Sequence, residues 1–164
     1  MKDLLLICSL ILGLLFNGTV AMAQDHTFSV LTTLGLGTPI LDNGLAGQLS
    51  INPRYQLAKH IAAEAQVSYL YSVVTSGFIN GNESRDHEVQ TLVGARFCIN
   101  PNGSFRWSIN ALAGANYSAN QNSGWAPGVS LGALVEKGPW AVGISAEATQ
   151  FFLFKVGYRI GPKG

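Results

Sequence analysis

Charged residues are scarce in this sequence, and neither sign dominates. Lys, Arg, Asp and Glu make up 12% of the 164 residues, with ten basic against nine acidic side chains. A nucleic-acid-binding protein carries a clear basic excess, so this balance argues against nucleic acid as a partner. Histidine is also rare, and we expect no two of His26, His60 and His87 to share a metal ion. The sequence therefore indicates neither a metal site nor a cofactor.

Two further absences concern cysteine and long apolar runs. Cys8 lies in an N-terminal segment that we expect to be removed, which leaves Cys98 alone. No intrachain disulfide can then form. After residue 23, no run is long and apolar enough for a membrane-spanning helix.

The first 23 residues predict a cleaved secretory signal peptide. Lys2 precedes an apolar run over residues 4–16, and Ala21-Met22-Ala23 fits the small-x-small pattern of a signal-peptidase site. The alternative is a single membrane-anchoring helix, for which the apolar run is short. We therefore expect a signal peptide at residues 1–23 and one domain of ordinary size over residues 24–164.

The clearest pattern in the remaining chain is an alternation of apolar and polar residues over residues 104–118. One set is wholly apolar: Phe105, Trp107, Ile109, Ala111, Ala113, Ala115 and Tyr117. The other set is mostly polar: Arg106, Ser108, Asn110, Leu112, Gly114, Asn116 and Ser118. Side chains on a strand alternate between its faces, so this stretch predicts one long strand with an apolar and a polar face.

The same alternation recurs and predicts eight strands, at about residues 28–37, 45–57, 61–73, 86–99, 104–118, 129–136, 140–149 and 152–160. The connections after the second, fourth and sixth strands are tight turns, whereas those after the first, third and fifth are longer and polar. Pro53 lacks a backbone donor and predicts a bulge or kink in the second strand. The fold class predicted is all-β, an eight-stranded antiparallel up-and-down transmembrane β-barrel, for which such short turns and longer loops are typical.

Alternation alone does not decide which face lies inside. A soluble barrel or sandwich buries the apolar set, whereas a membrane barrel turns it outward. Most predicted strands reach the ~9–11 residues that a tilted strand needs to cross a bilayer. In addition, large rings on the apolar face gather near strand ends rather than in the middle, as expected at headgroup depth. Both features favour the membrane arrangement.

Two sets of candidate residues follow from this arrangement. Aromatic girdles are predicted at the tight-turn end by Tyr55, Phe97, Phe105, Trp107, Trp140 and Tyr158, and at the loop end by Tyr69, Tyr71, Tyr117 and Phe152. A polar network is predicted in the lumen by Arg54, Glu64, Glu88, Arg96, Arg106, Glu136, Glu147, Lys155 and Arg159. Because the charges on the polar face are mixed in sign, we expect them to pair inside the barrel.

The signal peptide, the strand count, the girdles and the closing stretch over residues 152–160 resemble the small bacterial outer-membrane β-barrel proteins, of the OmpA/OmpX-like or PorT-like kind. The resemblance covers about residues 28–160. It implies an outer-membrane location, contact with outer-membrane lipid, and recognition of the last strand by the barrel-assembly machinery. The terminal aromatic residue usual in that family is replaced here by Ile160, which Gly161-Pro162-Lys163-Gly164 follows.

No catalytic site is predicted. His87 lies between Asp86 and Glu88, but neighbours on a strand point to opposite faces. An eight-stranded barrel has room for side chains and little else. We therefore expect a non-enzymatic membrane protein with a structural or surface-interaction role, whose surface partner would be an unknown ligand or protein. A narrow outer-membrane channel and a soluble periplasmic ligand-binding barrel remain the alternatives.

Overall fold

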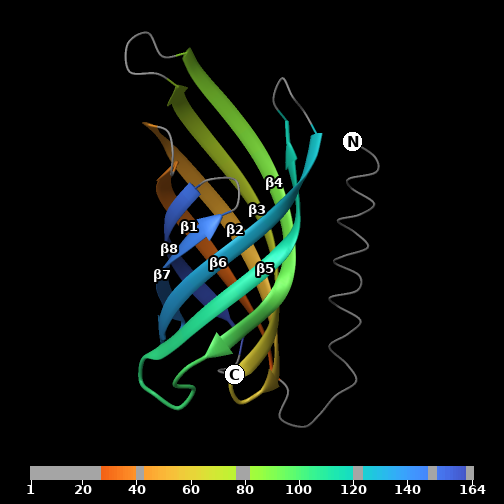
Figure 1. Ribbon diagram of the computed structural model, residues 1–164. Helices are drawn as coiled ribbons and strands as arrows, with labels where there is room; N and C mark the ends of the chain where they lie inside the picture. The colour runs from red at the N-terminus through yellow and green to blue at the C-terminus, as the bar shows by residue number, and fades with distance from the viewer. Residues whose placement is uncertain (1–26, 40–42, 77–81, 120–123, 148–150, 162–164) are drawn as a thin grey trace.

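The computed structural model describes residues 27–39, 43–76, 82–119, 124–147 and 151–161. These residues form eight strands: β1 (Phe28–Pro39), β2 (Asn43–Ala58), β3 (Ile61–Ser76), β4 (Asn82–Cys98), β5 (Arg106–Ser118), β6 (Gly124–Lys137), β7 (Trp140–Glu147) and β8 (Phe151–Ile160). Each strand pairs antiparallel with the next, and β1 pairs with β8, so the sheet closes (Figure 1). The predicted eight-stranded antiparallel barrel is confirmed. The predicted signal peptide, residues 1–23, lies outside the described residues.

Short connections join β2 to β3, β4 to β5 and β6 to β7 at one end of the barrel, which we call the tight-turn end. The opposite end is the loop end. Asn100 organises the β4–β5 turn, because its side-chain amide donates to the carbonyl of Phe105 and its Oδ1 accepts from the Trp107 N–H at 2.6 Å. Gly138 adopts a φ of 60° in the β6–β7 turn, a conformation that glycine reaches without strain. Within the described residues, no helix is long and apolar enough to cross a membrane.

Pro53 does not shift the strand register as predicted. On one side it pairs with Val30 of β1, and the β2–β3 register is the same before and after it. The irregularity comes later, between Gln56 and Ala58. The bulge is therefore not at Pro53, because the register changes only beside the turn. The β2–β3 pairing is nevertheless interrupted at Asn52 and Pro53, which have no register partners among the described residues of β3.

The β3–β4 hairpin extends beyond its neighbours at the loop end. Its pairing continues to Ser76 opposite Asn82, whereas the pairing of β4 with β5 begins only at Glu88 opposite Ser118. Figure 1 shows these two strands reaching past the rest of the barrel. Several strands are also longer at this end than the sequence indicated.

The two faces of the barrel wall differ in chemistry, as the alternation predicts. Every second residue of β8 is buried and the others are exposed, from Phe151 to Ile160. The exposed set of the barrel is apolar, with Val93 at 62% and Leu131 at 56% exposure, whereas most buried residues are polar. The apolar face therefore lies outside. This arrangement contradicts the soluble alternative, which requires the apolar set in the core.

An arginine on this outer face should destabilise the folded barrel far more than an apolar residue does. Ala113 is exposed near the middle of β5, so Ala113→Arg should lower the free energy of unfolding in phospholipid vesicles by about 2–4 kcal/mol if it lies at mid-bilayer. Ala113→Leu is the matched control and should change it little. Equal stability of the two variants would contradict a lipid-facing β5.

Candidate functional site

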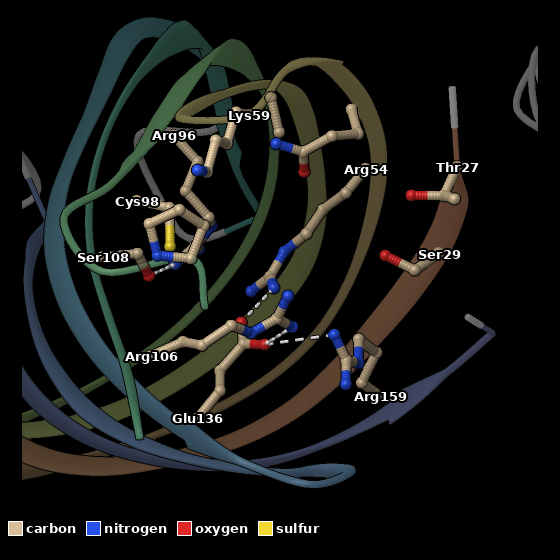
Figure 2. A pocket seen from close by; sticks show the side chains of 13 residues that line it. Thr27, Ser29, Arg54, Lys59, Arg96, Cys98, Arg106, Ser108, Glu136 and Arg159 are labelled. Atoms are coloured by element: carbon tan, nitrogen blue, oxygen red, sulfur yellow. Dashed lines mark hydrogen bonds and ion pairs between the residues drawn. The ribbon is translucent and has the colours of Figure 1, made fainter. Parts of the chain in front are cut away.

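Two carboxylates and four guanidinium groups form a charged cluster inside the barrel at the tight-turn end. We call these residues the arginine cluster: Arg54, Glu64, Arg96, Arg106, Glu136 and Arg159. Five of the six are at most 6% exposed, and Arg106 is partly buried. Figure 2 looks into this part of the lumen. The cluster has the highest density of charge in the described part of the chain.

Glu64 is held mainly by Arg96 on the neighbouring strand. Nη2 of Arg96 donates to Oε1 of Glu64 at 2.8 Å, and its Nε donates to Oε2 at 2.5 Å. This two-pronged geometry is the one that suits arginine and a carboxylate best. Asn52 adds a third bond at 3.0 Å, and the Nη1 of Arg96 donates to Ser108. Glu64 and Arg96 are thus a well-bonded pair.

Glu136 is shared by three arginines. Nη2 of Arg106 donates to its Oε2 at 2.9 Å from the adjacent strand, where the two residues are register partners. Arg54 donates through Nη1 to Oε1, and Nη1 of Arg159 lies 3.5 Å from Oε2. Because Arg54 comes from β2 and Glu136 from β6, this bond crosses the lumen and ties opposite walls together (Figure 2).

Uncharged polar side chains fill the middle of the lumen. Gln48 donates to Gln90 at 3.2 Å, Ser68 donates to the same amide oxygen at 3.0 Å, and Asn52 donates to Gln66 at 3.3 Å. These residues are at most 3% exposed. The Ser68 and Asn52 bonds join neighbouring strands and follow from the strand register. The Gln48 bond does not, because it reaches from β2 past β3 to β4.

Nearer the loop end, a buried ion pair adjoins an apolar cluster. Lys155 Nζ lies 2.8 Å from Oε1 of Glu147, which also accepts bonds from Ser130 and Ser145. The apolar cluster consists of Ala46, Leu70, Phe151 and Leu153. Polar and apolar layers together occupy the lumen along its length.

The structure places all nine predicted lumen residues on the inner face, with Glu88 towards the loop end. It brings together those of the arginine cluster and, separately, Glu147 and Lys155. The predicted girdle residues lie on the outer face, Tyr55 being half-buried there. Sequence reasoning missed Trp125, the second residue of β6, whose ring packs at a tilt on Tyr117 with centroids 5.3 Å apart, and Phe151, which points inward. In the described ranges, no three His, Cys, Asp or Glu side chains are grouped to hold a metal ion.

The Glu147–Lys155 pair allows a clean test of lumen pairing. Glu147→Leu should strand a buried ammonium group and lower the free energy of unfolding by about 3–5 kcal/mol. Adding Lys155→Met should recover most of that loss, because the double variant buries no charge. The contrasting double variant combines Glu136→Gln with Arg106→Gln. It leaves Arg54 and Arg159 beside a neutral residue, so it should recover little of the stability lost in Glu136→Gln alone. Additive losses for Glu147 and Lys155 in urea unfolding would contradict a coupled pair.

Comparison with known proteins identifies the architecture. No family model matches the sequence, and no curated protein matches it. Among solved structures, the outer membrane enzyme PagL is similar with a TM-score of 0.56 at 12% identity, covering 79% of this chain and 98% of that one. Ail of Yersinia pestis (0.45, 13%, 82% and 97%) and neisserial surface protein A (0.43, 8%, 85% and 97%) are more distant. The chain has the fold of the small eight-stranded outer-membrane β-barrel proteins.

Proposed function

We propose that the protein is a small integral outer-membrane β-barrel with a side-chain-filled lumen and a structural or surface-interaction role. The observation that carries the proposal is the inversion of polarity, with an apolar outer face around a polar interior. Soluble proteins rarely expose apolar patches larger than a few hundred Å². Lipid is the surrounding in which such a face is stable, and a closed barrel leaves no unpaired backbone edge in it.

The aromatic residues support this placement. Near the tight-turn end, Trp140 and Tyr158 pack edge to face with ring centroids 5.2 Å apart. At the loop end, Tyr71 packs against His87 at 5.0 Å, and Tyr117 packs against Trp125. Rings with one polar atom favour the headgroup region on both sides of a membrane. Outer-membrane lipid is therefore the first partner that we propose.

The β3–β4 hairpin supports the surface-interaction part of the proposal. In outer-membrane barrels, the short turns face the periplasm and the longer connections face outward. With that topology, the extension of β3 and β4 beyond Glu88 projects from the cell surface. The partner proposed for this projecting part of the hairpin is an unknown surface ligand or protein. During biogenesis, the regular alternation of β8 suits recognition by the barrel-assembly machinery.

A non-enzymatic role is part of the same proposal. The imidazole of His87 is bonded to the Tyr69 hydroxyl and packs on Tyr71. The Nδ1–H of His60 donates to the Cys98 carbonyl, and the His60 ring stacks on Phe97. Both rings thus have structural partners on or near the outer face. The likeness to PagL, at 12% identity, concerns the fold and does not transfer its activity.

The location and topology can be tested together. An epitope tag inserted beside Asn82 should be found in the outer-membrane fraction and be reached by antibody on intact cells, because the β3–β4 hairpin lies outside. The same tag placed in the β6–β7 turn at Gly138 is the matched control and should be reached only after the membrane is opened. A protein found in the periplasmic fraction would contradict the proposal, and the reverse labelling would invert its topology.

Because side chains fill the lumen, we expect the protein not to conduct ions across planar bilayers. The wild type should give little or no single-channel conductance, since the buried side chains of the described residues fill most of a narrow lumen. Phe151→Ala removes the largest side chain of the apolar cluster and should raise conductance only slightly, because the arginine cluster remains. Phe152→Ala, on the outer face, is the control. A steady, large wild-type conductance would favour the channel alternative.

A further inference from the structure

The arginine cluster carries more positive than negative charge. Four guanidinium groups face the carboxylates of Glu64 and Glu136. The other buried carboxylates of the described residues lie elsewhere, Glu147 with Lys155 and Glu88 towards the loop end. The described residues of the cluster thus carry four positive and two negative charges. An excess charge removed from water is costly unless an opposite charge joins it.

Two of these arginines also have hydrogen-bond donors to spare. Arg54 uses Nη1 for Glu136, but its Nη2 and Nε make no hydrogen bond, and Nε lies 3.6 Å from the nearest oxygen of Glu64. Arg159 uses Nη2 for the carbonyl of Gly138, and its Nε makes none. Both side chains are more than nine-tenths buried. Buried donors without acceptors are rare and point to a missing partner.

The spare donors border a cavity. The cavity measures about 40 Å³, and its wall includes Arg54, Arg106, Arg159, Glu136 and the hydroxyl groups of Thr27 and Ser29. Figure 2 shows these side chains around one space, with the two hydroxyls on the β1 side facing the arginines. A single water needs roughly 10–15 Å³ by this kind of measure. The cavity therefore has room for a small ligand.

A basic residue lies where this cavity reaches the outside. Exposed Lys59, in the β2–β3 turn, belongs to the same wall. Its charge adds to the excess of the arginine cluster, so an anion that approaches the tight-turn end meets a positive potential. Cations are disfavoured there for the same reason.

We propose that this cavity binds a small phosphate-type oxyanion at the tight-turn end of the barrel. The planar guanidinium fork matches the oxygens of a phosphate group, and a doubly charged anion balances the two excess positive charges. Arg54 and Arg159 supply the donors, and the hydroxyls of Thr27 and Ser29 complete the polar wall. Glu136 lines the same cavity, but three arginines already neutralise its charge. The proposal does not depend on what the outer loops bind.

The test is calorimetric titration of the full-length folded protein in an uncharged, phosphate-free maltoside detergent. Sodium phosphate should bind saturably, whereas sodium chloride at equal ionic strength should give no such heat. Arg159→Gln should weaken phosphate binding about tenfold or more, since a charge-assisted hydrogen bond and one unit of charge are lost. Arg54→Lys keeps the charge but loses the fork, and should weaken it as well. Arg85→Gln removes an exposed cation at the loop end and should leave binding unchanged.

A gain-of-affinity variant separates a ligand site from a purely structural cluster. Glu136→Gln removes a negative charge from the cavity wall, so phosphate should raise its melting temperature by more than it raises that of the wild type. An equal or smaller rise would contradict the proposal. So would an equal loss of affinity in Arg85→Gln and Arg159→Gln, which indicates general charge attraction.

A second titration distinguishes a phosphate group on a lipid from one free in solution. Micelles that contain phosphatidylglycerol present the group on a lipid, and inorganic phosphate presents it free in solution. A response to free phosphate that requires Arg159 assigns a soluble anion, and a response only to the lipid, again requiring Arg159, assigns a headgroup. If neither probe stabilises the wild-type protein, the cavity is not an anion site.

Discussion

The pairing of β1 with β8 is the constraint on which the rest of the structure depends. Ten register pairs, from Val30 opposite Ile160 to Pro39 opposite Phe151, remove the last free edges of the sheet. Without free edges, the backbone has no polar groups to satisfy in lipid, and the outer face can be wholly apolar. The same closure fixes a narrow interior with room for side chains and little else. The interior side chains must therefore satisfy one another, and the layers of the lumen follow from this requirement.

Within the arginine cluster, basic side chains outnumber carboxylates, and each carboxylate is shared. Glu64 and Glu136 each bind more than one basic side chain, and Glu136 connects β2, β5, β6 and β8 through its three arginines. A carboxylate can accept several hydrogen bonds, so one glutamate can bind side chains from several strands at once. The arginine cluster thus both ties the barrel wall together and leaves the positive excess from which the anion site is inferred.

The sequence predicted the fold well where alternation was regular and poorly where it was not. Residues 104–118 gave the faces of β5 because every second residue changes character. Gly124 to Gly128 contain alanine, proline and glycine, whose small side chains carry no facing signal, so the start of β6 and the outward Trp125 were missed. Neighbouring pairs such as Arg106 and Glu136 follow from hairpin register. The reach of Arg54 across the lumen does not, because it depends on the barrel diameter and on side-chain length rather than on adjacency along the ladder.

The unequal strand lengths imply that the barrel does not meet the bilayer evenly around its circumference. Within the described residues, β7 has eight residues, against 16 in β3. At about 3.4 Å per residue and a tilt of about 40°, β7 spans roughly 21 Å of membrane thickness, less than the ~25 Å apolar band usual for such barrels. Lipids beside β7 should therefore be compressed, while those beside β3 are not. From these described lengths we expect the membrane to be thinner beside β7 than beside β3, so that lipids and neighbouring proteins would meet a different membrane on the two sides of the barrel.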